Sequence, residues 1–187
     1  MIVYLHGFNS SPQSHKAQVM ARFMAEQGRA GQFLCPALPT QAREAIAAVE
    51  NLMARAPGAR HCFVGSSLGG FYATWLAEKH DARAVLLNPA IDPHLGLRAY
   101  LGEQKNLHSG EPYQLTQAHL DGWQALFVPK PTPSRYLLIV ETGDEVLDYR
   151  RALERYRGAE QVVVEGGDHS LQSFPRHLSR ILAFADL

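Results

Sequence analysis

Short apolar runs alternate along this chain with segments in which apolar residues recur every three or four positions. Six of the apolar runs have the length of a strand, and they stay apolar instead of alternating with polar residues. Continuous runs of this kind are typical of strands covered on both faces, as in a parallel sheet. The predicted strands are residues 2–5, 32–35, 61–64, 84–87, 136–141 and 161–165.

The segments between these runs have the spacing of amphipathic helices. Apolar residues line one face of residues 19–24, of residues 45–56 and of residues 178–185. Strands and helices that alternate in this way predict a doubly wound parallel sheet with helices on both faces. Because ligands of such sheets bind beyond the carboxyl ends of the strands, the residues that directly follow each strand are the first candidates for chemistry.

One connection departs from this pattern. Six prolines lie between residues 87 and 136, and the segment is much longer than an ordinary crossover. We expect it to contain one helix that packs on the sheet, with residues 114–127 as the best candidate. The remaining length, within residues 91–133, is expected to form a small cap over the carboxyl edge of the sheet.

The composition excludes several classes of protein. Of 187 residues, 46% are hydrophobic and 19% are charged, as in an ordinary globular protein, and the length favours a single domain over residues 1–187. The 18 basic and 18 acidic residues balance, so we expect no binding of nucleic acid or of an anionic membrane surface. With no signal-peptide pattern and no long apolar stretch, a cytoplasmic location is the default expectation.

The strongest local motif is Gly65-Ser66-Ser67-Leu68-Gly69, which lies between a predicted strand and a helical pattern. Gly-x-Ser-x-Gly at such a junction is typical of a nucleophile elbow, in which a sharp turn exposes the serine at the edge of the sheet. Only Ser67 has glycines two positions before and two positions after it. We therefore expect Ser67 to be the nucleophile of a serine hydrolase.

A serine nucleophile needs a base, and the base needs an acid that orients it. His169 follows the last predicted strand on a loop with two glycines, and Asp144 follows the strand before it. The order Ser67, Asp144, His169 is the chain order of α/β-hydrolases. Asp92, which follows the strand at residues 84–87, is an alternative acid that the sequence leaves open.

Acyl transfer also requires hydrogen-bond donors for the oxyanion that develops on the substrate. The Leu68 amide, at the start of the helix after the elbow, is the first candidate donor. The second is the Phe8 amide, on the loop after the opening strand, where His6 is expected to orient the loop. The two cysteines form no metal-binding pattern, and hydrolysis through a serine nucleophile needs no metal and no organic cofactor, so we expect neither.

Several motifs together resemble a known family. They are Tyr-Leu-His-Gly-Phe-Asn-Ser-Ser-Pro, Val-Gly-Ser-Ser-Leu-Gly-Gly-Phe-Tyr-Ala-Thr-Trp, Leu-Asn-Pro-Ala, Thr-Gly-Asp-Glu-Val-Leu-Asp-Tyr and Glu-Gly-Gly-Asp-His. The chain is similar to the small bacterial YqiA-type esterases of the α/β-hydrolase superfamily, least so between residues 95 and 133. The resemblance implies a six-stranded sheet of order 2-1-3-4-5-6, without the superfamily's usual first two strands. It also implies a carboxylesterase with Ser67, Asp144 and His169 at the triad positions.

These observations favour hydrolysis of short-chain carboxylic esters through an acyl-enzyme on Ser67. The partner is then a small-molecule acyl ester or thioester. A thioesterase, or another acyl-transfer enzyme with the same triad, remains an alternative. So does a noncatalytic ligand-binding protein with a hydrolase fold.

Overall fold

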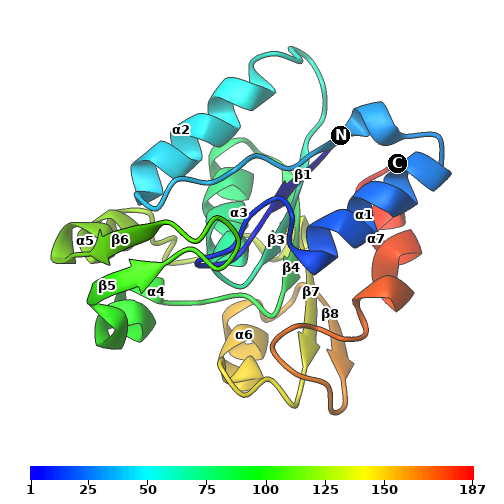
Figure 1. Cartoon of the computed structure of the whole chain (residues 1–187). Helices are drawn as coiled ribbons and strands as arrows, with labels where there is room; N and C mark the ends of the chain where they lie inside the picture. The colour runs from blue at the N-terminus through cyan, green and yellow to red at the C-terminus, as the bar shows by residue number, and fades with distance from the viewer.

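The computed structural model describes residues 1–187, and its centre is a six-stranded parallel sheet of order β2-β1-β3-β4-β7-β8 (Figure 1). Counted along the chain, the strands of this sheet run in the order 2-1-3-4-5-6, so the expected order is confirmed. The strands are β1 (Ile2–Leu5), β2 (Phe33–Leu34), β3 (Cys62–Ser66), β4 (Arg83–Leu87), β7 (Tyr136–Glu141) and β8 (Glu160–Val164). Each lies within two residues of its predicted position at both ends.

Helices cover both faces of the sheet. Successive residues of a strand point to opposite faces, and because the strands are largely apolar, both faces carry apolar side chains. Val3 and Leu5 of β1 belong to one apolar core, whereas Ile2 and Tyr4 belong to the other. The first core contains side chains from α2 (Ala42–Met53), α3 (Leu68–Lys79), α5 (Gln117–Ala125) and α6 (Tyr149–Arg155). The second contains side chains from α1 (His15–Glu26) and α7 (Leu178–Phe184), which lie together on the other side of the sheet in Figure 1.

The long connection between β4 and β7 contains more structure than the sequence predicts. It forms α4 (Pro93–Gly96), an antiparallel hairpin of β5 (Gly102–Lys105) and β6 (Pro112–Leu115), and then α5. The hairpin lies beside α4 and α5, away from the two chain ends (Figure 1). The short 3₁₀ turns of the chain are η1 (Ala30–Gln32), η2 (Leu97–Tyr100), η3 (Pro133–Arg135) and η4 (Phe174–His177).

The helix predicted at residues 114–127 is shorter in the structure, because its first two residues belong to β6. Thr116 precedes the helix in extended conformation, and its N–H donates to Nδ1 of His119 at 3.1 Å. This contact at the N-cap defines where α5 begins. The helix also ends at Ala125, so the sequence prediction was right about the helix and wrong about both of its ends.

The parallel register brings the ends of several strands to one edge of the sheet. Leu5 pairs with Gly65, and Glu141 pairs with Val164. The loops that follow β1, β3, β7 and β8 therefore leave the sheet at the same edge. Among the helices, none combines the length and the apolar character that crossing a membrane requires.

Candidate active site

The turn between β3 and α3 depends on its glycines. A Cβ atom on Gly65 would lie 2.2 Å from the carbonyl oxygen of Gly69, and a Cβ atom on Gly69 would lie 2.0 Å from that of Leu5. Both contacts are with backbone atoms, so no side-chain movement could relieve them. The first glycine lets α3 fold back on its own strand, and the second lets it approach β1.

Ser67 lies at the tip of this turn in a sparsely populated conformation, with φ of 54° and ψ of −120°. Its N–H donates to the carbonyl oxygen of Leu87 at 3.0 Å, and its own carbonyl oxygen accepts from Gly70 and Ala90. Strained backbone of this kind persists where the surroundings hold it on several sides. The end of β4 therefore helps to hold the elbow in place.

The structure brings Ser67, His169 and Asp144 into one hydrogen-bonded chain. Nε2 of His169 lies 3.1 Å from Oγ of Ser67, and Nδ1 of the same ring lies 2.9 Å from Oδ2 of Asp144. The Asp144 side chain is 1% exposed and that of His169 is 23% exposed. The three side chains come from loops after β3, β7 and β8, as the sequence predicts.

Asp144 is held as an anion by its surroundings. Burial by itself raises the pKa of this carboxyl group, but the hydrogen bonds from His169 and from the backbone of Leu147 and Val146 outweigh burial, and the pKa lies below its ordinary value. The two backbone N–H groups donate to Oδ1 at 2.8 and 2.9 Å. An ionised carboxylate accepts from the His169 Nδ1–H, which leaves Nε2 free to accept a proton.

Asp92, the alternative acid, makes a different contact. Its carboxylate pairs with the guanidinium of Arg151 on α6, and it makes no hydrogen bond to His169. Asp92 is also the residue that precedes α4. The geometry therefore favours Asp144 as the partner of His169.

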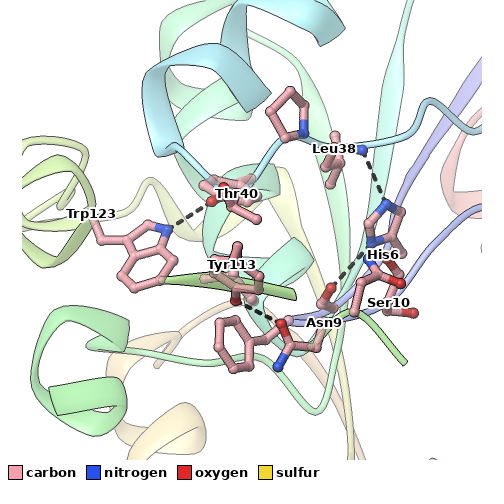
Figure 2. A pocket seen from close by; sticks show the side chains of 13 residues that line it. His6, Asn9, Ser10, Leu38, Thr40, Tyr113 and Trp123 are labelled. Carbon is pink, nitrogen blue, oxygen red and sulfur yellow. Dashed lines mark hydrogen bonds between the residues drawn. The ribbon is translucent and has the colours of Figure 1, made fainter. Parts of the chain in front are cut away.

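The loop after β1 is fixed by His6, whose side chain is buried (Figure 2). Nε2 of His6 accepts from the N–H of Leu38 at 3.1 Å, so the ring proton is on Nδ1 and faces the Gly7 carbonyl oxygen, also at 3.1 Å. Burial lowers the pKa of this imidazole, against the raising effect of the Gly7 contact. A neutral His6 thus ties the loop to the segment before α2, in agreement with the orienting role that the sequence suggested.

This loop passes directly beside Ser67. A Cβ atom on Gly7 would lie 3.3 Å from the Ser67 Cβ atom. The next N–H group, that of Phe8, donates no hydrogen bond to another group of the chain, and Leu68 is the first residue of α3, so its N–H has no partner within that helix. Both residues line the cavity that also contains Ser67 and His169. Two unpaired backbone donors next to a serine hydroxyl are an arrangement that fits an oxyanion.

The β5–β6 hairpin braces the same loop from outside (Figure 2). The Tyr113 hydroxyl donates to Oδ1 of Asn9 at 2.6 Å, and the carbonyl oxygen of Asn9 accepts from the N–H of Leu107 at 2.9 Å. Asn9 has a φ of 53°, which asparagine tolerates better than most residues. The Phe8 ring meets the Trp123 ring edge to face, with centroids 6.3 Å apart.

A cavity of about 310 Å³ opens beside Ser67 and His169. This volume is at the lower end of the range of small-molecule sites. Most of the residues in its wall are apolar, and the polar ones are Ser67, Asp92, Asp148, Arg151 and His169. The apolar residues of the wall are Phe8, Leu68, Pro89, Ala90, Ile91, Pro93, Leu97, Tyr100, Val146 and Leu147.

The sequence analysis missed two polar residues at the ends of strands. Asn88 directly follows β4, and Glu141 is the last residue of β7; both are buried. Both contact the loop that carries His169. The sequence feature that could have identified both is a polar residue at the end of an otherwise apolar run. No group of three or more His, Cys, Asp or Glu side chains is arranged to hold a metal ion.

Comparison with known proteins places this geometry in context. A family model described as "Uncharacterised protein family (UPF0227)" matches residues 1–186. The UPF0227 protein YcfP of Salmonella gallinarum is 26% identical over 189 residues, covering 100% of this chain and 99% of its own length.

Solved structures with a similar fold include two hydrolase-fold proteins. Alpha/beta hydrolase domain-containing protein 10 from mouse superposes with a TM-score of 0.74 at 17% identity, over 99% of this chain and 88% of its own. Est1E from Butyrivibrio proteoclasticus, solved with ferulic acid bound, superposes with a TM-score of 0.74 at 14% identity, over 98% of this chain and 86% of its own. The chain therefore has the α/β-hydrolase fold, as the resemblance of its motifs implied.

Proposed function

The chain belongs to the UPF0227 family, and from the geometry of its site and its hydrolase fold we propose that it is a serine hydrolase that cleaves short-chain carboxylic esters. The observation that carries the proposal is the pair of hydrogen bonds that connects Ser67 Oγ to His169 and His169 to Asp144, next to the Phe8 and Leu68 amides. These are the parts that acyl transfer requires: a nucleophile, a base, an orienting acid and donors for the oxyanion.

The first half of the reaction forms an acyl-enzyme. The Ser67 oxygen attacks the ester carbonyl carbon while its proton moves to Nε2 of His169, and Asp144 stabilises the imidazolium through Nδ1. The carbonyl oxygen becomes an oxyanion and accepts hydrogen bonds from the Phe8 and Leu68 amides. When the tetrahedral intermediate collapses, the bond to the alcohol oxygen breaks and His169 gives its proton to the leaving alkoxide.

The second half releases the acid. His169 takes a proton from a water molecule, and the resulting hydroxide attacks the acyl carbon. The Ser67–acyl bond then breaks and the proton returns from His169 to the Ser67 oxygen. Each step uses only groups of the chain, the substrate and water.

The modest volume and largely apolar wall of the cavity support short acyl or alcohol groups. The same machinery would cleave a thioester, whose leaving thiolate needs less help from His169. A panel of p-nitrophenyl esters and matching thioesters of increasing chain length measures that preference. We expect turnover to be highest for acetate and butyrate and to fall for longer chains.

The decisive test is covalent labelling. A fluorophosphonate probe is expected to modify Ser67 of the folded wild-type protein, located by mass spectrometry, and to leave Ser67→Ala unmodified. Ser66→Ala is the matched control, because it alters the neighbouring serine, and it should keep the label. Equal turnover of p-nitrophenyl butyrate by wild type and Ser67→Ala would contradict the proposal and favour a ligand-binding role.

A further inference from the structure

The loop that carries His169 has little regular structure of its own. Between the end of β8 and the start of η4 it contains three residues with positive φ, namely Gly166, Gly167 and Leu171. Leu171 is a buried leucine with φ of 57°, a conformation that costs free energy for a branched side chain. Such a loop keeps its shape only if groups outside it hold its backbone.

Glu141 makes three of these contacts, more than any other residue. Its Oε2 atom accepts from the N–H groups of Asp168 at 2.8 Å and Gln172 at 3.1 Å, and its Oε1 atom accepts from that of Ser173 at 2.7 Å. One amide precedes His169 in the chain, and the other two follow it. A single carboxylate therefore holds the loop on both sides of the histidine.

The fit between this carboxylate and the loop is close. A Cβ atom on Gly167 would lie 1.9 Å from Oε2 of Glu141, so the glycine is needed for the carboxylate to reach the backbone. Glu141 is 1% exposed and forms no ion pair within 4.0 Å. Burial by itself raises the pKa of Glu141, but the hydrogen bonds from Ser173, Asp168 and Gln172 outweigh it and lower the pKa. The backbone amides of the loop thus stabilise the ionised form of Glu141, and the Glu141 carboxylate in turn fixes these amides.

Four other side chains also contact the backbone of the loop, among them Thr142, whose Oγ1 accepts from the Gly166 N–H at 2.9 Å. Nδ2 of Asn88 donates to the carbonyl oxygen of Asp168 at 3.0 Å, while its Oδ1 accepts from the Glu141 N–H, also at 3.0 Å. Nζ of Lys16 donates to the Ser170 carbonyl oxygen at 2.6 Å, and Oε2 of Glu145 accepts from the His169 N–H at 3.0 Å. Glu141 differs from these in contacting three residues of the loop, one before His169 and two after it.

We propose that Glu141 is a positioning residue: its carboxylate fixes the backbone on both sides of His169 and thereby sets the imidazole at hydrogen-bond distance from both Ser67 and Asp144. The kinetic consequence rests on the proposed hydrolysis at Ser67. The geometric consequence, an ordered His169–Asp144 hydrogen bond, does not depend on any substrate.

Glu141→Gln is the informative substitution, because it keeps the shape and removes one of the two acceptor oxygens. The amide NH₂ then faces at least one backbone N–H, and the loop loses a contact beside His169. A shift of about 1 Å in a catalytic group costs about 100-fold in rate. We expect kcat for p-nitrophenyl butyrate to fall about 100-fold while KM stays within about twofold.

Glu78→Gln is the matched control. Glu78, on α3, accepts from the Thr132 N–H at 2.6 Å and from the Tyr136 hydroxyl at 2.5 Å, at the opposite end of β7. Losing an acceptor there should lower the melting temperature to a similar extent. It should leave kcat and the His169 loop unchanged.

The readout specific to positioning is the proton resonance of His169 Nδ1–H, which a hydrogen bond to a carboxylate moves far downfield in the NMR spectrum. We expect this signal in wild type and in Glu78→Gln, and its loss in Glu141→Gln together with faster amide exchange at residues 168–173. Retention of both the signal and kcat in folded Glu141→Gln would overturn the proposal, as would equal losses in Glu78→Gln. If wild type cleaves no ester, the proposed function fails, while the resonance still decides this inference.

Glu141→Asp keeps the test decisive if Glu141→Gln does not fold. Aspartate retains the charge but is one methylene shorter, so it cannot reach all three amides. We expect the Nδ1–H signal to be lost and kcat to fall as in Glu141→Gln. Wild-type kcat and an intact signal in Glu141→Asp would overturn the proposal, because His169 would then be positioned without the hydrogen bonds from all three amides to this carboxylate.

Discussion

Replacing Ser67 with glycine is expected to abolish activity and to give a more stable protein than replacing it with alanine. The residue has φ of 54° and ψ of −120°, a conformation that is open to glycine and that costs a residue with a Cβ atom about 1–3 kcal/mol. Against this, glycine lowers the stability by about 0.5–1 kcal/mol relative to alanine, because a glycine has more conformational freedom in the unfolded chain. The free energy of unfolding of Ser67→Gly should therefore exceed that of Ser67→Ala by about 0–2.5 kcal/mol.

Ser67→Ala is the correct reference, since both variants lack the hydroxyl and its hydrogen bond to His169. For a chain of this size, 1 kcal/mol changes the melting temperature by about 2–4 °C. Thermal unfolding followed by circular dichroism should place Ser67→Gly a few degrees above Ser67→Ala, and neither variant should turn over p-nitrophenyl butyrate. A Ser67→Gly protein that melts below Ser67→Ala would refute the reasoning that the elbow stores strain.

Further predictions concern the groups around the elbow. Asp144→Asn should lower kcat about 10⁴-fold, because His169 loses the acceptor that fixes its tautomer, and Asp92→Asn should stay within a few fold; the reverse pattern in steady-state kinetics would exchange their roles. Tyr113→Phe removes a hydrogen bond worth about 0.5–1.5 kcal/mol from the loop after β1 and should lower kcat about 2- to 10-fold at unchanged KM, and an unaltered kcat would count against bracing by the hairpin. The folded pKa of His6 lies below its unfolded value of about 6.5, so the unfolded chain binds the proton first and stability falls as the pH drops below that value. Urea unfolding of wild type and His6→Asn at pH 7.5 and 5.5 should show that the variant loses less unfolding free energy between the two pH values. Equal losses in the two proteins would exclude His6 as a source of the pH dependence of stability.

The sheet and the three central side chains were predictable because each depends on local sequence and on one topological rule. Apolar runs identified the strands, and a parallel sheet brings their carboxyl ends together whatever the loops contain. Ser67, Asp144 and His169 each lie just beyond such an end. Their convergence follows from the strand order, which the resemblance supplied.

The cap and the support of the site were not predictable by the same means. The β5–β6 hairpin is half exposed, so its residues lack the continuous apolar pattern of a buried strand. Glu141 and Asn88 bind backbone groups from residues about 30 and 80 positions away, and no sequence spacing encodes such contacts. A pattern shows which residues are apolar, but it does not show which amide a buried carboxylate will meet.

The contact between the hairpin and the loop after β1 has a consequence for altering this protein in the laboratory. Tyr113 and Leu107 hold Asn9, the neighbour of Phe8, while Tyr100 and Leu97, just before the hairpin, form part of the cavity wall. Under the proposed hydrolysis, the same segment therefore affects both substrate selectivity and rate. Exchanging the cap between relatives would transfer turnover along with substrate preference, and libraries restricted to cavity-lining positions would omit residues that tune the rate from outside.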